Sequence, residues 1–280
     1  MKQPKDDDRT PVLSKKITKG QHIIPAKIIK KWKQDGILLT KIKNNQKLQK
    51  ISNERNKKGL FSVYHRWSQS FEVYANEVVE QPFFKLIDEL EKDERDIIKF
   101  DFIKDRQTLT IIKYHELIKR RMFYKLNNSN EIFKNFVGVE SSNFTKEQQE
   151  ILEHKHIGYY VNNQMIGCEW AQYRTHIDFD KFCAENGSRQ LKEHQNWFYI
   201  RIHDKTSRFV LPDNWNNWQI ISVSPDSILI SQAFINYLGW IGILPFLDIK
   251  SPPIPIRKIV KLSSIINRLA LCVYDKWLIL

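Results

Sequence analysis

Hydrophobic periodicity changes along the chain, and this change limits the fold more than any other feature of the sequence. Segments 71–90 and 93–126 contain no glycine and a single proline, and their apolar residues recur every three or four positions, which predicts two long helices. A helical pattern returns over 259–273. Between them, runs of aromatic and β-branched residues predict short antiparallel strands over 197–202, 209–211, 218–223 and 227–231. Helices, then a sheet, then a helix are typical of an α+β protein rather than of a βαβ series.

The N-terminal part of the chain predicts two further elements. Residues 1–20 are polar and include two prolines, so we expect a mobile basic arm that precedes a single α+β domain over 21–280. Pro25 is placed to open a short helix that ends near Trp32. Two short runs around the polar turn 44–46 predict a β-hairpin with a lysine-rich exposed face. The expected architecture is a basic N-terminal helix and β-hairpin, a helical middle, a short antiparallel sheet and a C-terminal helix.

Nearly all of the excess positive charge lies at the N-terminal end. The formal net charge is +13, and residues 1–60 hold 17 Lys and Arg against 5 Asp and Glu, whereas residues 61–280 hold 28 against 27. A field of this kind attracts phosphates, so we predict contact with nucleic acid. His65 and Arg66 lie between two aromatic residues, a combination that can stack on bases. The other candidate contacts are Lys27, Lys30, Lys31, Lys33, Lys41, Lys43, Arg55, Lys57 and Lys58.

The lysine-rich composition is also compatible with roles that involve no nucleic acid. Lysine is a common surface residue, and the chain has 32 Lys against 13 Arg, although arginine has the planar fork that reads bases. The positive face is then a solvated surface, or it contacts an acidic protein or an anionic membrane. The main alternative hypothesis is a non-catalytic interaction protein that docks an acidic protein partner through its lysine-rich N-terminal face.

Cysteine usage and hydropathy indicate the compartment. The three cysteines are widely spaced, and no two of them form the C-x-x-C pair that is typical of zinc or dithiol sites. This usage fits the reducing cytoplasm. Residues 1–20 lack the apolar run of a signal peptide, so we do not expect secretion. The most apolar stretch, 233–247, spans ~22 Å as a helix, which is shorter than a ~30 Å hydrocarbon core. We therefore expect it to be buried interior and expect no membrane partner.

Several landmarks occur in a characteristic order. They are a His-hydrophobic-x-Pro motif before a helix that ends in an aromatic residue, then a hairpin, a glutamate-bearing helix, an Asp-Asn pair after a strand, a proline-containing stretch before a strand, and an asparagine in the last helix. In this chain the motif and the aromatic residue are 22–25 and Trp32, the hairpin is 37–51, and the glutamates are Glu72 and Glu77. The pair is Asp213-Asn214, the proline-containing stretch is 224–229, and the asparagine is Asn267. This order resembles the bacterial domain-of-unknown-function family 4238 over about residues 22–275. The resemblance implies a fold and assigns no reaction, and here the Asp-Asn pair lacks the family's flanking Ser and Pro.

One set of candidate catalytic residues follows a nuclease pattern. Asp226 follows a proline, and Asp248 is separated by one residue from Lys250, an order that resembles many metal-dependent nucleases. In those enzymes two carboxylates hold the metal ion and a lysine orients water or stabilises charge. The pattern implies Mg²⁺ or Mn²⁺ only if the protein is a nuclease, for example one of a bacterial defence or toxin system.

A second set of candidate catalytic residues lies at the ends of predicted elements. His22 precedes a helix, and Asp213 and Asn214 follow a strand, so the three side chains could converge on a cleft that holds a metal ion or a phosphate. Alternatively, His22 caps local backbone and Asp213-Asn214 form an Asx-type turn.

The polar side of the predicted helix 93–126 is rich in charge. Its members cluster near the helix end, where the dipole favours cations, and a contact with phosphate is the other role that they could have. They are Lys113, His115, Glu116, Lys119, Arg120 and Arg121. Glu72 and Glu77 are five positions apart and share no helical face, so we expect both to be exposed.

Overall fold

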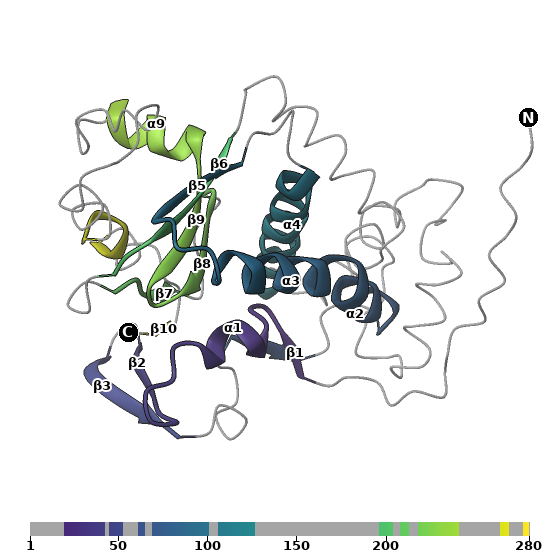
Figure 1. Ribbon diagram of the computed structural model, residues 1–280. Helices are drawn as coiled ribbons and strands as arrows, with labels where there is room; N and C mark the ends of the chain where they lie inside the picture. The colour runs from purple at the N-terminus through teal and green to yellow at the C-terminus, as the bar shows by residue number, and fades with distance from the viewer. Residues whose placement is uncertain are drawn as a thin grey trace, which may run out of the picture.

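The computed structural model combines helices with antiparallel sheets, which confirms the predicted α+β class (Figure 1). No helix within the described residues is long and apolar enough to span a bilayer. The structure describes residues 20–42, 45–52, 61–64, 69–100, 106–126, 196–203, 208–212, 218–240, 264–268 and 277–279.

One of the two four-stranded sheets separates two hydrophobic clusters. It has four antiparallel strands in the order β5, β6, β9, β8, namely β5 (Ile97–Phe100), β6 (Trp197–Arg201), β9 (Ser227–Ser231) and β8 (Ile220–Ser224). Successive side chains point to opposite faces of a strand. Trp197 and Tyr199 therefore belong to one cluster, and Phe198 and Ile200 belong to the other. Both faces of this sheet are buried, so each must be covered by another layer.

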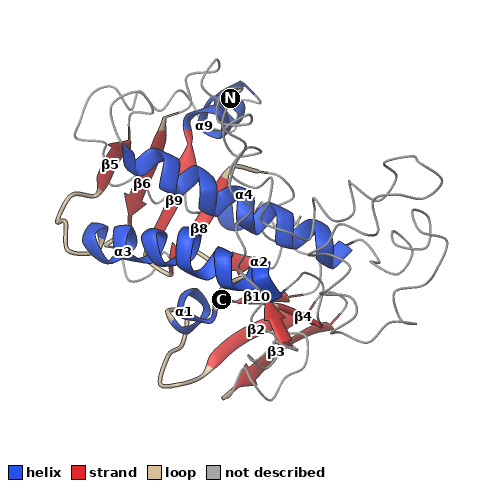
Figure 2. Ribbon diagram, turned by 90° about the vertical axis from the view of Figure 1, so that its right-hand side faces the viewer, coloured by secondary structure: helices blue, strands red, loops and turns tan. Residues whose placement is uncertain are grey.

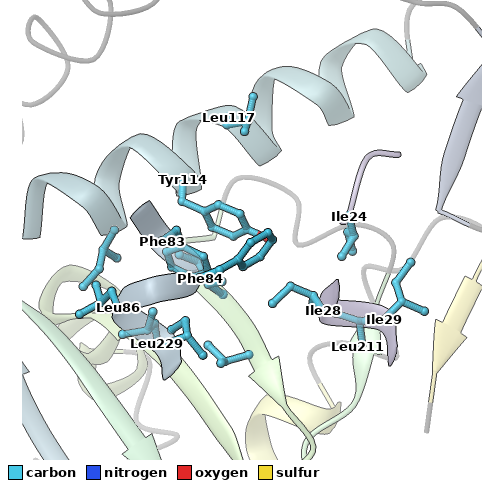
Figure 3. Packing of buried hydrophobic residues seen from close by; sticks show 14 of the residues in the cluster. Ile24, Ile28, Ile29, Phe83, Phe84, Leu86, Tyr114, Leu117, Leu211 and Leu229 are labelled. Atoms are coloured by element: carbon cyan, nitrogen blue, oxygen red, sulfur yellow. The ribbon is translucent and has the colours of Figure 1, made fainter. Parts of the chain in front are cut away.

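Helices provide these two layers. Helices α3 (Gln81–Leu90) and α4 (Arg106–Leu126) lie across one face of the sheet, and α9 (Gln232–Trp240) lies on the other side (Figures 1 and 2). The rings of Phe83 and Tyr114 stack between α3 and α4 with their centroids 3.6 Å apart (Figure 3). The second cluster includes the buried side of α9.

A single helical segment leads into α3. It begins with α2 (Gln69–Tyr74) and continues through the π-helix η2 (Ala75–Glu80), so the predicted helix over 71–90 is present. The guanidinium of Arg201 donates hydrogen bonds to the carbonyl oxygen of Leu90, at 2.7 Å, and to that of Asp93. Arg201 thereby caps α3 and links this helix to β6.

Segments from both halves of the sequence form the remaining sheets. A four-stranded antiparallel sheet has the order β3 (Asn45–Ile51), β2 (Leu38–Ile42), β10 (Trp277–Ile279), β7 (Leu211–Pro212), and a two-stranded sheet pairs β1 (Gly20–His22) with β4 (Ser62–Tyr64). Helix α1 (Ala26–Lys30) follows Pro25 as predicted, and β2 and β3 form the predicted hairpin. One hydrophobic cluster includes Ile23, the helical layer and Ile279. It joins the N-terminal elements to the rest of the core.

The structure differs from the predicted architecture in three details. The predicted helix over 93–126 is interrupted by β5, because Ile97 to Phe100 pair with β6, and α4 begins only at Arg106. The segments 197–202 and 209–211 are predicted as strands of one short antiparallel sheet, but β6 and β7 lie in different sheets because β7 pairs with β10. Within the described part of the predicted helix over 259–273, residues 264–268 are helical, and an additional strand that was not predicted, β10, follows at Trp277–Ile279.

Candidate nucleic-acid interface

The β2–β3 hairpin begins at a tight turn. Asp35 and Gly36 have φ of 50° and 76°, a conformation that Asp-Gly pairs favour. The turn is closed by two backbone hydrogen bonds between Gln34 and Ile37, of 2.9 and 2.8 Å. Strand β2 therefore starts in a fixed orientation directly after this turn.

The register of the hairpin separates its lysines from its buried residues. Residues directly opposite each other in an antiparallel pair project to the same face. Lys41 is paired with Leu48 and Leu39 with Lys50, so these four residues share the outer face. Leu38 and its partner Ile51 are buried on the inner face. The outer face is open, since Leu48 is 56% exposed and Lys50 is exposed.

The hairpin is also uniform in charge. Residues 38–51 contain four lysines and no acidic residue. Lys41 and Lys50 form no ion pair with any described residue. Strand β3 is an edge strand, and lysine on an edge prevents pairing with another chain, so Lys50 also has a structural use. The hairpin lies at the end of the molecule opposite α9 (Figures 1 and 2), where a large ligand can approach it.

The lysines of α1 and of the residues just after it differ from those of the hairpin. Lys27 Nζ lies 3.0 Å from Asp88 Oδ2, and Lys31 Nζ pairs with Glu91 Oε1. Lys30 is exposed and has no ion pair with the described residues, whereas Lys33 is half-buried. Carboxylates of α3 thus neutralise part of the predicted basic surface.

Several predicted contacts lie outside the described residues. They are Lys43, Arg55, Lys57, Lys58, His65 and Arg66. Their participation in the interface stays a prediction.

Each set of residues predicted to be catalytic has only one member within the described part of the chain, so the convergence of either set stays a prediction. Asp226 is exposed in the turn between β8 and β9, where its N–H donates to Ser224 Oγ at 3.2 Å. His22 is half-buried on β1, opposite Ser62. Asp213, Asn214, Asp248 and Lys250 lie outside the described residues. The described segments contain no group of three His, Cys, Asp or Glu side chains that could hold a metal ion.

Asn267 has a structural contact next to one of these candidate sites. Its Oδ1 accepts a hydrogen bond from the N–H of Val210 at 3.1 Å, and its Nδ2 donates to the carbonyl oxygen of Arg208 at 2.6 Å. These bonds fix the backbone just before β7. The chain therefore enters the Asp213-Asn214 segment from a defined position.

A buried ionic cluster was missed by sequence reasoning. The Arg121 guanidinium donates from Nη1 to Glu80 Oε1 and from Nη2 to Glu72 Oε2, the latter at 3.5 Å, and Arg121 is 1% exposed. Glu72 and Glu80 are eight positions apart. A π turn holds about one residue more than an α turn, so one turn of each kind together spans about eight residues. The π-helix thus places both carboxylates on the side that faces α4. Burial, and then the charge of Glu80, raises the pKa of Tyr114 well above its ordinary value, against the opposing effect of Arg121.

A second buried cluster joins α4 to the central sheet. His115 Nε2 lies 3.2 Å from the carbonyl oxygen of Trp218, and His115 Nδ1 lies 3.5 Å from Glu116 Oε1. Lys119 Nζ donates to Glu116 Oε1 at 3.1 Å. The His115 ring also contacts the ring of Trp197, with centroids 5.5 Å apart.

Four of the six residues on the predicted polar side of this helix are therefore buried. The buried residues are His115, Glu116, Arg120 and Arg121. They are buried because α4 meets the α2–α3 segment on one side, where Arg121 contacts Glu72 and Glu80, and the sheet on another, where His115 contacts Trp197. A signal was present in the sequence for Arg121, which lies seven positions after Tyr114 and therefore on the same helical stripe. Glu72 is half-buried against Arg121, whereas Glu77 is exposed as expected.

Comparisons with protein families, curated proteins and solved structures found no match to this chain. The resemblance to family 4238 therefore rests on the residues quoted for it.

Proposed function

We propose that this protein binds the phosphate backbone of nucleic acid through the outer face of the β2–β3 hairpin. The observation that carries the proposal is the charge of this hairpin, which has four lysines and no carboxylate and directs Lys41 and Lys50 to its outer face. Lysine contacts phosphate as a point charge and does not read base edges, so the expected binding tolerates changes of sequence. The major groove of DNA admits a two-stranded ribbon of this kind.

The proposal is tested by titrating the protein into a fluorescent oligonucleotide of arbitrary sequence at 50 and 200 mM salt. We expect binding at low salt and a steep loss at high salt, since counterions are released from each contacted phosphate. The Lys41→Gln/Lys50→Gln variant should bind more weakly, and on duplex DNA its slope of log affinity against log salt should be less steep by about 0.9 for each lost contact. A matched control is Lys92→Gln/Lys99→Gln, which removes the same charge from exposed positions outside the hairpin.

The outcomes separate the proposal from its main alternative. A complete lack of binding at low salt would contradict nucleic-acid binding and leave an acidic protein as the partner of the lysine-rich face. Equal losses in the hairpin variant and in the control would show that net charge alone, and not the hairpin, determines the affinity.

Cleavage is a separate hypothesis, because no observation on the described residues favours a metal site. Incubation of RNA and DNA with Mg²⁺ or Mn²⁺ tests it, and unchanged substrate would end the nuclease hypothesis. If cleavage occurs, Asp226→Ala and Asp248→Ala should abolish it. The cytoplasm stays our proposal for the compartment, on the basis of the three widely spaced cysteines.

A further inference from the structure

We propose that Asp88 and Glu91, at the C-terminal end of helix α3, compete with nucleic acid for Lys27 and Lys31 and so withhold these lysines from phosphate. This inference rests on the proposed function and extends it to two lysines that precede the hairpin in the sequence. A carboxylate and a phosphate both present charged oxygen acceptors to a lysine ammonium. A lysine that is held by one is therefore not available to the other.

The two ion pairs lie one after the other along the contact between α1 and α3. Lys27 Nζ contacts both carboxylate oxygens of Asp88, at 3.0 and 3.3 Å. Lys31 lies four positions later, and its Nζ contacts Glu91, which lies three positions after Asp88. Residues three or four apart are neighbours on a helix surface. The spacing of the lysines on one helix therefore matches the spacing of the carboxylates on the other.

Hydrophobic packing holds α1 and α3 in the positions in which these two ion pairs form. Ile28 and Ile29 of α1 are buried in the same hydrophobic cluster as Phe83 and Phe84 of α3 (Figure 3). Lys27 Nζ also lies 4.9 Å from the centroid of the Phe84 ring, a cation–π contact. Because both backbones are anchored, the lysines can leave the carboxylates only by changing side-chain rotamers.

The basic N-terminal region is thus divided into two sets. Lys41 and Lys50 on the hairpin form no ion pair with the described residues, whereas Lys27 and Lys31 are neutralised. The carboxylates have a second effect, since their negative charge weakens the positive field of the N-terminal region. Removal of these carboxylates should therefore increase both the affinity and its dependence on salt.

The test compares Asp88→Asn/Glu91→Gln with the wild-type protein in the oligonucleotide titration. We expect the double variant to bind several-fold more tightly at 50 mM salt, and on duplex DNA its salt slope should be steeper by about 0.9 for each released lysine that contacts a phosphate. Glu89→Gln is the matched control, because Glu89 is exposed on the same helix and forms no ion pair with the described residues. Addition of Lys27→Gln/Lys31→Gln to the double variant should abolish the gain.

The outcomes distinguish failure of this inference from failure of the proposed function. If neither the wild type nor the double variant binds at low salt, nucleic-acid binding itself fails. If the wild type binds and the double variant has the same affinity and slope, α3 is not a competitor although the proposed function stands. An equal gain in Glu89→Gln, or a gain that survives loss of both lysines, would show that the change in net charge alone raises the affinity. Either result would overturn the inference. Binding by the double variant alone would support it.

Discussion

Glu116 is an ionisable side chain buried within the helical layer, at 1% exposure. Burial raises the pKa of this carboxyl, but its interactions with His115 and Lys119 outweigh burial, so the pKa lies below the ordinary value of 4.5. A carboxyl whose pKa is lower in the folded state stabilises the fold when it is ionised. This stabilisation is present above about pH 4.5 and is lost as the pH falls through the lowered pKa of the folded state.

We predict that Glu116→Gln lowers the free energy of unfolding at pH 7 by about 1–3 kcal/mol, because the amide keeps the shape of the side chain and loses its charge. The difference from the wild type should shrink as the pH falls below 4.5. Urea denaturation between pH 3.5 and 7 measures it, with the exposed Glu89→Gln as a control that should change little. A difference that grows toward low pH would show that the carboxyl is neutral in the folded protein.

Secondary-structure elements were predicted correctly where the residues that determine them lie close together in the sequence. The helix after Pro25 and the β2–β3 hairpin were predicted because their capping and turn residues lie next to them in the sequence. Strands β5 and β10 were missed because each becomes a strand only by pairing with a segment that is far away in the sequence, β6 and β2 respectively. A three- or four-residue apolar run carries no information about such a partner.

The π-helix η2 provides a test at this scale. We predict that deletion of the exposed Glu77 turns α2 by about 100° relative to α3, since each helical residue advances the chain by that angle. Phe71, which is 0% exposed, and Glu72 would then leave the side that faces the core and Arg121. Loss of the buried ring alone should cost about 3–5 kcal/mol of unfolding free energy.

Thermal or urea unfolding of the Glu77 deletion measures this effect, and Glu77→Ala is the matched control. The substitution changes the same exposed position without changing the register, so it should stay within about 0.5 kcal/mol of the wild type. If the two variants are equally stable, the π turn does not set the orientation of α2.

For the whole molecule, charge and topology were predictable to different degrees. The concentration of lysine in the first 60 residues is a property of the sequence, but its division between α1 and the hairpin depends on Asp88 and Glu91, which approach α1 only in the fold. The burial of Arg121 likewise depends on two carboxylates from another helix. Patterns of single residues predict faces of elements, and they do not predict which charged groups meet across two elements.

The strand β10 connects the proposed interface to the rest of the protein. Ile279 is 0% exposed, is paired with Thr40 of β2 and with Leu211 of β7, and belongs to the same hydrophobic cluster as Leu38. The hairpin therefore depends on a segment more than 200 positions away for its position. Truncation of a buried aliphatic side chain leaves a cavity that neighbouring groups fill only in part.

We predict that Ile279→Ala lowers the free energy of unfolding by about 2–5 kcal/mol and increases hydrogen exchange at the β2 amides. If the hairpin is the nucleic-acid interface, the variant should also bind the oligonucleotide more weakly, since its lysines lose a fixed position. Leu48→Ala is the control, because Leu48 is 56% exposed on the same hairpin and should change stability by less than about 0.5 kcal/mol. Unchanged exchange at β2 in Ile279→Ala would mean that the hairpin is held by its own turn and by the pairing of β2 with β3, and not by β10.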